Sequence, residues 1–197
     1  DNTVIIYTSD NGFLCGSRGY ASKVVGFVEA SRVPLIVFDP RVKNPVSEQL
    51  DSPRRCDALT GNVDIAPTIL SLAGLQTPEK MDGRDLMTLY QSPDSTIHDT
   101  LPLINVWGPK AVHSLGVVTK KWKYIYWPYE DGSMKPTEEL YDKQHDPLEL
   151  TNLSHVDSAA GDLIRMRSLY DRALNHWKDQ AVPDHDYQPY GEVFQRH

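Results

Sequence analysis

Two short apolar runs near the start of the chain constrain its fold more than any other feature. The first, Val4 to Thr8, is rich in β-branched residues, and the second, Val33 to Phe38, ends at Asp39 and Pro40. Near-continuous apolar runs of this length are typical of strands that are covered on both faces. A glycine-bearing loop, Ser9 to Gly19, follows the first run. The pattern predicts two strands at the edge of an α/β sheet.

A helix is predicted further along the first half of the chain. From Asn62 onward, apolar residues repeat at helical spacing. Pro67 falls in the first turn, where its missing N–H does no harm, and Gly74 can end the helix. The polar, proline-containing stretch before it, residues 41–61, is expected to be a surface loop.

The second half of the chain has a different pattern. Three short runs separated by turn residues predict antiparallel strands: Leu101 to Val106, Ser114 to Thr119 and Lys123 to Trp127. Glu138 to Tyr141 is a candidate fourth strand, and apolar residues stepping by three or four predict a helix from Ala159 to Gln180. We therefore expect an α/β fold, with part of a large mixed sheet flanked by helices in residues 1–95. A small antiparallel sheet packed with a C-terminal helix is expected in residues 96–197.

Composition excludes several classes of function. Hydrophobic residues make up 40% and charged residues 24%, and no apolar run approaches the roughly 20 residues of a membrane span. We expect a globular protein with no membrane partner. The chain contains 20 Lys and Arg residues and 27 Asp and Glu residues. The resulting net charge of −7 disfavours nucleic acid as a partner. Cys15 and Cys56 form neither a disulfide framework nor a zinc motif.

The first candidate site is the run Ser9, Asp10, Asn11, Gly12 directly after the first predicted strand. Side-chain oxygens at the carboxyl end of a strand can face the crevice where open α/β sheets bind ligands. Oxygen ligands of this kind suit Ca²⁺ or Mg²⁺. An ordinary Asx turn uses the same residue types, so spacing alone leaves both interpretations open.

A single lysine beyond the glycine loop is the second candidate. The loop has no nucleotide-binding fingerprint, but its glycines could let backbone and cations approach an oxyanion. The ammonium of Lys23 could neutralise charge on a sulfate or phosphate ester. A solvated surface lysine is the alternative.

Taken together, these segments resemble the sulfatase family of the alkaline phosphatase superfamily. The resemblance begins with "DNTVIIYTSDNG", the glycine loop before Lys23, and "EASRVPLIV". It continues with "NVDIAPTILSLAGL", "MDGRDL", "KWKYIYW" and "ELYDKQHDPLELTNL". These segments lie in the family's order over residues 1–155. The resemblance implies an incomplete alkaline phosphatase-like fold.

The resemblance also implies roles for particular residues. Asp10 and Asn11 would contribute to one Ca²⁺ site, and Lys23 would be the catalytic residue that binds the sulfate group. Arg18, where many relatives have His, and His113 would bind substrate, although ordinary loop and turn roles remain open for both. Sulfatases use a formylglycine made in a Cys/Ser-x-Pro-x-Arg motif, which none of the 14 prolines here matches. We expect that group, and the other calcium ligands, in a missing N-terminal part of the same protein.

The function implied by the resemblance is hydrolysis of a sulfate ester. The substrate would be a sulfated small molecule or glycan. Because enzymes of this family are usually periplasmic or secreted, we expect the same location here. The chain enters its first strand without a signal peptide or initiator methionine, so we expect a piece of a longer polypeptide that is inactive alone. A phosphatase or phosphonate hydrolase of the same superfamily, or a non-catalytic module that binds glycans or a partner, remain alternatives.

Overall fold

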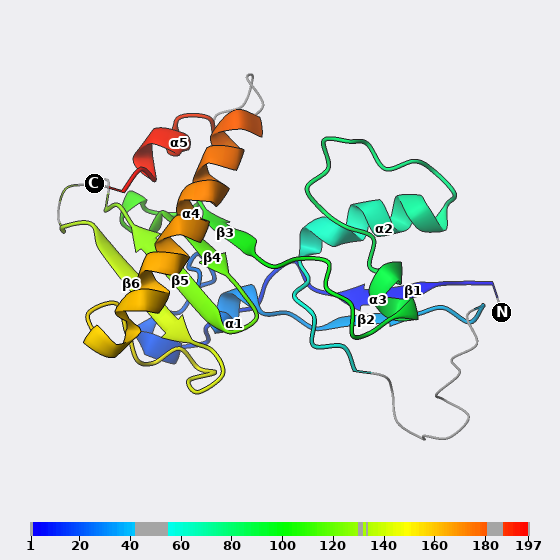
Figure 1. Cartoon of the computed structure of the whole chain (residues 1–197), viewed down its shortest axis with the longest axis horizontal. Coiled ribbons are helices and arrows are strands. Elements are labelled where there is room, and N and C mark those ends of the chain that lie inside the picture. Colours follow the sequence, from blue (N-terminus) through cyan, green and yellow to red (C-terminus); the bar gives the residue numbers. More distant parts are fainter. Residues whose placement is uncertain (1, 42–54, 130–131, 133, 181–186, 197) are drawn as a thin grey trace. The chain divides into compact units, whose positions relative to one another are not determined.

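The computed structural model describes residues 2–41, 55–129, 132, 134–180 and 187–196, which form two compact units (Figure 1). The first unit comprises Asp1–Asp10 and Val33–Asp99, and the second comprises Asn11–Arg32 and Thr100–His197. The domain division expected from the sequence, between residues 95 and 96, stays a prediction. In the structure, the segment 11–32 groups with the C-terminal residues and connects two strands of the first unit.

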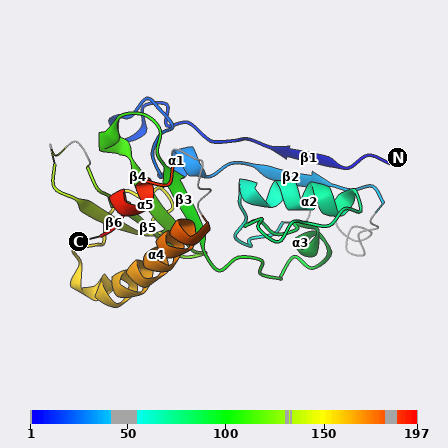
Figure 2. The same cartoon turned by 90° about the horizontal axis from the view of Figure 1, so that it is seen from above.

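The sheet of the first unit has two antiparallel strands. β1 (Ile5–Thr8) pairs with β2 (Leu35–Phe38), so that the two predicted apolar runs do form strands. Exposed and half-buried residues alternate along both strands, and neither contains a buried residue. The prediction of cover on both faces is therefore not met by the described chain. Helices lie on one side of this sheet (Figure 2), whereas the other side displays Ile5, Tyr7, Ile36 and Phe38, each more than half exposed.

The helix predicted from Asn62 is present in the first unit. A short 3₁₀ turn, η2 (Asn62–Asp64), leads into α2 (Ile65–Leu72), and a further helix, α3 (Met87–Gln91), was not predicted. Gly83 lies against η2, where a Cβ would stand 1.9 Å from the carbonyl oxygen of Val63. Most of the predicted loop before α2, residues 42–54, lies outside the described residues.

A buried carboxylate fixes the start of α2. Asp64 is fully buried and accepts hydrogen bonds from the amides of Gly61 (2.8 Å) and Arg84 (2.7 Å). His98 Nε2 lies 2.7 Å from the same carboxylate. Asp64 therefore ties three separate stretches of the first unit together.

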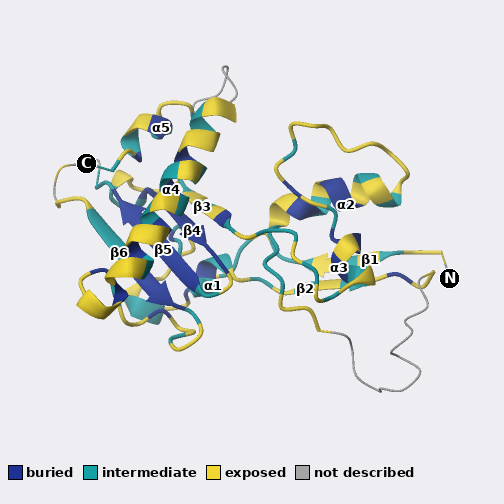
Figure 3. Ribbon diagram, in the orientation of Figure 1, coloured by how far each residue is buried: buried dark blue, intermediate teal, exposed yellow. Residues whose placement is uncertain are grey.

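The second unit contains the predicted antiparallel meander. β3 (Leu101–Asn105), β4 (Ser114–Val118), β5 (Trp122–Trp127) and β6 (Thr137–Asp142) pair in chain order. Every residue of β4 and β5 is buried (Figure 3). Because side chains of a strand alternate between the two faces, this sheet is covered on both faces.

Two elements provide that cover. The helix α4 (Ala160–Gln180), predicted from its apolar periodicity, packs Leu163, Met166, Tyr170 and Leu174 against one face of the sheet. The other face, which includes Ile125, Trp127 and Tyr141, packs against Leu14, Val25, Phe27 and Ala30 of the segment 11–32. The short helix α1 (Val28–Ser31) belongs to this segment. The loop that contains the candidate site residues is thus part of a hydrophobic core.

The C-terminal tail also enters the core. It contains α5 (Tyr190–Val193), and Phe194 directly after it is fully buried. The hydroxyl of Tyr170 donates to the carbonyl oxygen of Phe194 over 2.6 Å, and Arg196 pairs with Asp171 at 2.7 Å.

Among the described residues, none of the helices combines the length and the apolar character needed to cross a membrane.

Candidate functional site

The structure brings two of the predicted site residues into direct contact. The Nζ atom of Lys23 donates a hydrogen bond to Oδ1 of Asn11 over 2.9 Å. Both residues belong to the segment 11–32 of the second unit. A cation and an amide dipole twelve positions apart in sequence therefore form one polar group.

Backbone hydrogen bonds of the segment explain how this contact forms. The amide of Leu14 donates to the carbonyl oxygen of Ser22 (3.0 Å), and the amide of Gly12 donates to that of Ala30 (2.9 Å). A Cβ on residue 12 would lie 1.9 Å from the carbonyl oxygen of Glu29, so only glycine permits this approach. The loop is folded back on itself at Asn11, as the contact with Lys23 requires.

Asn62 holds the turn that contains Asp10, and both residues belong to the first unit. Nδ2 of Asn62 donates to the carbonyl oxygens of Ser9 (3.0 Å) and Asp10 (2.9 Å), while Oγ of Ser9 lies 3.4 Å from Oδ1 of Asp10. Asp10 ends one stretch of the first unit and Asn11 begins the second unit. Sequence reasoning did not assign a role to Asn62, which it treated only as the start of a helix.

The donor atoms of Asp10 and Asn11 fit the chemistry of Ca²⁺, which binds carboxylate and amide oxygens. Their number does not suffice, since Ca²⁺ takes about six to eight oxygens. Within the described parts of the chain, no three His, Cys, Asp or Glu residues form a group that could hold a metal ion. Asp10 and Asn11 by themselves would provide only part of a calcium shell.

Arg18 has several contacts within the second unit. Its side chain is 14% exposed and lies 3.7 Å from Oε2 of Glu29. The guanidinium lies over the ring of Phe27, 4.1 Å from its centroid, and donates to the carbonyl oxygen of Leu148. These interactions hold the guanidinium within the second unit, and a role in substrate binding remains a prediction.

His113 is buried rather than exposed on a turn, at 4% exposure, and it directly precedes β4. Its ring meets the ring of Tyr190 edge to face at 5.2 Å. Binding of substrate by His113 also remains a prediction.

The side-chain amide of Asn105 connects the backbone next to Lys23 with the backbone next to His113. Nδ2 of Asn105, at the end of β3, donates to the carbonyl oxygens of Val24 (2.8 Å) and Val112 (2.7 Å). Val24 follows Lys23 and Val112 precedes His113. Asn105 therefore holds together two backbone stretches that contain predicted site residues. In the sequence, Asn105 lies within the predicted strand Leu101 to Val106, and that pattern does not predict its two carbonyl partners.

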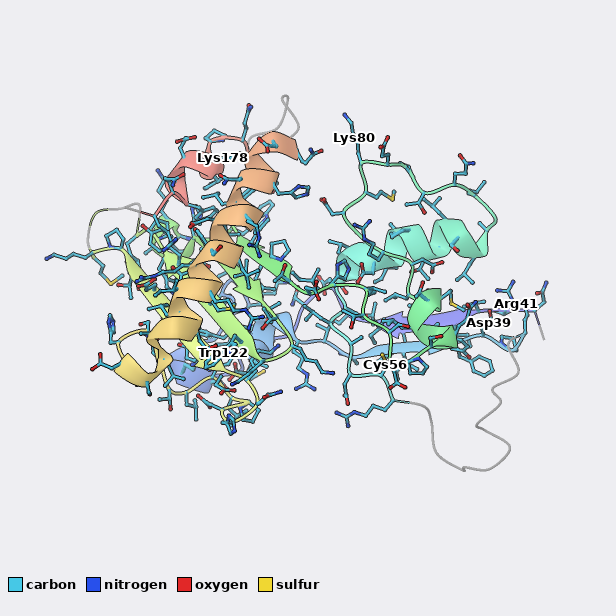
Figure 4. All side chains as sticks on the ribbon, in the orientation of Figure 1. Asp39, Arg41, Cys56, Lys80, Trp122 and Lys178 are labelled. Carbon is cyan, nitrogen blue, oxygen red and sulfur yellow. The ribbon has the colours of Figure 1, made fainter. Side chains whose placement is uncertain are left out.

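An ion pair lies directly after β2 in the first unit (Figure 4). Nε and Nη2 of Arg41 donate to the two carboxylate oxygens of the buried Asp39, at 2.9 and 2.8 Å. These bonds hold the pKa of Asp39 below its ordinary value. Because Arg41 is two residues away in sequence and binds both oxygens, we interpret the pair as a structural turn.

The chain is similar in sequence and fold to known proteins. The family model described as N-sulphoglucosamine sulphohydrolase, C-terminal, matches residues 16–173. Choline-sulfatase of Rhizobium meliloti is 29% identical over 183 residues, which cover 92% of this chain and 33% of the relative. N-acetylglucosamine-6-O-sulfatase of Bacteroides thetaiotaomicron is 30% identical over 185 residues, covering 91% and 31%. A solved structure described as a complex with its substrate D-glucosamine-2-N,6-O-disulfate superposes with a TM-score of 0.76 at 26% identity, covering 94% and 36%.

The chain spans about a third of the length of these curated relatives. The similarity to the solved structure extends over almost the whole chain, which confirms the expected α/β fold of the sulfatases. The family model covers both the segment that contains Lys23 and the four-stranded sheet. This chain belongs to the sulfatases, as the C-terminal domain that the N-sulphoglucosamine sulphohydrolase family describes.

Proposed function

We propose that this chain is the C-terminal part of an enzyme that hydrolyses a sulfate ester, with Lys23 binding the sulfate group. The observation that supports this proposal is the hydrogen bond from Lys23 to Asn11. It fixes an ammonium group beside a residue that the family resemblance assigns to the metal site. A positive charge held in place before the reaction stabilises negative charge that develops in the transition state.

The residues of this chain would act on the sulfate oxygens. Lys23 would donate hydrogen bonds to them, and its contact with Asn11 would keep the ammonium in place between turnovers. Asp10 and Asn11 would hold Ca²⁺, which would polarise the sulfate oxygens as a Lewis acid. A formylglycine, expected outside these 197 residues, would supply the nucleophile. Because sulfatases are usually periplasmic or secreted, we also propose this location for the enzyme.

A sulfated sugar is the substrate class that we favour. The name of one relative and the substrate of the solved neighbour both refer to sulfated glucosamine. In this chain, Trp107 is 67% exposed and its ring meets that of Tyr187 at 6.5 Å. An exposed indole provides an apolar surface on which a sugar ring can stack. Choline sulfate, named for another relative, is the competing substrate.

The test is sulfate release by the full-length protein that contains this chain. Lys23→Met should lower kcat/KM by about 10²-fold, since loss of one charge-stabilising donor typically costs 10²–10³. Lys80→Met changes an exposed lysine of the first unit and is the matched control. Activity of Lys23→Met within about twofold of the parent enzyme would refute the proposed role.

The choice of ester distinguishes the remaining candidates. Glucosamine 6-sulfate, choline sulfate and a phosphate monoester should be compared at equal concentration. Preferential release of phosphate would favour the phosphatase alternative. Glycan binding without any turnover, retained in Asp10→Ala and Lys23→Ala, would favour the non-catalytic module.

A further inference from the structure

A buried ion pair lies in the second unit, formed by two residues to which the proposed function assigns no role. Nζ of Lys123, on β5, lies 2.7 Å from Oε1 of Glu149, and the two side chains are 3% and 0% exposed. Two charges lose most of their hydration when they are buried, and well-packed apolar residues of similar volume stabilise a fold at least as well. Stability of the sheet alone therefore does not explain the pair.

The other polar contacts of the pair all go to one short stretch of chain. Nζ of Lys123 donates to the carbonyl oxygen of Gly26 (2.9 Å) and to Oγ of Ser31 (3.1 Å). Oε2 of Glu149 accepts a hydrogen bond from the amide of Val28 (2.9 Å). Two charged side chains thus hold three positions between Gly26 and Ser31.

That stretch in turn holds both residues of the Asn11–Lys23 contact. Lys23 lies three positions before Gly26. The carbonyl oxygen of Ala30, within the stretch, accepts the amide of Gly12, which follows Asn11. Displacement of residues 26–31 would therefore move Lys23 through the backbone that connects it to Gly26. It would move Asn11 through the hydrogen bond between Gly12 and Ala30.

The backbone of Glu149 is held in an unusual conformation. Its φ is 55°, in the left-handed region that residues other than glycine rarely adopt. Such a conformation persists only where surrounding structure fixes it. The amide of Glu149 is also bonded to the carbonyl oxygen of Asp146 over 3.0 Å, within the turn that follows β6.

We propose that Lys123 and Glu149 are positioning residues, which fix the stretch 26–31 and through it the contact between Asn11 and Lys23. The importance of that contact for catalysis rests on the proposed function. The geometry itself can be tested without turnover, so that the two ideas fail separately.

The test is amide hydrogen exchange, followed by NMR on the 197-residue chain. Glu149→Gln retains the size and one carbonyl oxygen of the side chain but leaves Lys123 without a counter-charge. The amides of Gly12, Val28 and Ala30 should exchange at least about tenfold faster through local opening, a larger factor than for the amides of β4 and β5. The side-chain amide signal of Asn11 should move toward its position in Lys23→Met, a signature that a general loss of stability does not produce.

Glu192→Gln is the matched control. Oε1 of Glu192 lies 3.2 Å from Nζ of Lys178, and its side chain is 84% exposed. The same chemical change at this exposed pair should alter neither the exchange rates of 12–31 nor the Asn11 signal.

A double variant keeps the test decisive if Glu149→Gln does not fold. Lys123→Met with Glu149→Gln removes both charges, so no unpaired charge remains buried and the sheet should form. Its stretch 26–31 should still exchange faster than in the parent protein, because the bonds from Lys123 are gone. Parent-like exchange there, or equal acceleration in β4 and β5, would overturn the positioning role.

Comparison with the activity test separates the two proposals. Parent-like order in the double variant, combined with an inactive full-length Lys23→Met enzyme, would refute the positioning role alone. Loss of local order, combined with a fully active Lys23→Met enzyme, would refute the role of Lys23 alone.

Discussion

The two sheets of this chain are built from similar apolar residues but differ in how far those residues are buried. In the four-stranded sheet, β4 and β5 are buried at every position, between α4 on one face and the segment 11–32 on the other. In the two-stranded sheet, exposed and half-buried residues alternate along β1 and β2. Apolar sequence alone therefore does not report whether both faces of a strand are covered within the same chain.

The difference has an energetic consequence for each unit. Burial of apolar surface is the main stabilising term in folding, and the second unit buries a continuous core on both sides of its sheet. The first unit depends more on polar anchors such as Asp64. Substitutions in the two units should therefore act through different interactions.

The largest effect is expected from a core residue of the second unit. Met166 on α4 is fully buried in the cluster beneath the sheet. Met166→Ala should lower the free energy of unfolding by about 2–5 kcal/mol, through lost burial and the cavity that remains. Urea unfolding followed by tryptophan fluorescence measures this unit alone, because Trp107, Trp122, Trp127 and Trp177 all belong to it.

The control for this prediction is on the same helix. Ile164 is 66% exposed, so Ile164→Ala should change stability by less than about 0.5 kcal/mol. Equal losses for the two variants would contradict the described packing of α4.

In the first unit, the strongest effect is expected from a polar substitution. Asp64→Asn removes the charge from a buried carboxylate that accepts two amide hydrogen bonds and lies 2.7 Å from Nε2 of His98. Because hydrogen bonds to charged groups contribute about 1.5–3 kcal/mol each, the loss should be about 2–3 kcal/mol. Amide exchange in α2 is the measurement. Asp57→Asn, at a 68% exposed side chain of the same unit, is the control and should leave that exchange unchanged.

The pH dependence of the second unit provides a third, smaller test. Burial, with the positive charge of Lys123, lowers the pKa of Lys143 from 10.5 to about 8. Between these values the unfolded chain binds the proton more strongly than the folded chain does, so stability should rise with pH above about 8. The urea midpoint of the parent protein should therefore increase from about pH 8 to about pH 9.5 more than that of Lys143→Met. Equal pH dependence in the two proteins would show that this lysine is not desolvated.

The smallest effect is expected on the displayed face of the first sheet. Tyr7 is 60% exposed, so Tyr7→Ser in the 197-residue chain should cost less than about 0.5 kcal/mol. Binding of an apolar fluorescent dye should fall, because Tyr7 lies beside Ile36 opposite it in the sheet. Ile164→Ser, at an exposed position of α4, should change dye binding less. A loss above about 2 kcal/mol for Tyr7→Ser would mean that the face is covered.

Much of the fold could be predicted because periodicity reports local structure directly. The meander and α4 were predicted to within about two residues of their observed ends. The short helix α3 and the burial of Phe194 were not predicted. Neither a single helical turn nor an aromatic residue in a polar tail has a pattern that distinguishes burial from exposure.

The candidate site was predictable in composition but not in geometry. Asn11 and Lys23 were identified from residue types and family resemblance, and the structure places them in contact. The contributions of Asn105 and Glu149 depend on carbonyl oxygens that are distant in sequence. Only tertiary structure reveals such partners, because any asparagine or glutamate could form similar bonds elsewhere.

The segment 11–32 leaves the first unit after residue 10 and returns to it at residue 33, yet its apolar side chains pack on strands that begin after residue 100. On a ribosome, Asn11 and Lys23 therefore emerge long before β5 and Glu149 have been synthesised. Chains generally acquire structure from the N-terminus during synthesis. Here the proposed sulfate-binding loop can become ordered only after β5 and Glu149 have been synthesised. A product truncated before them would lack an ordered site even though it contains Asn11 and Lys23.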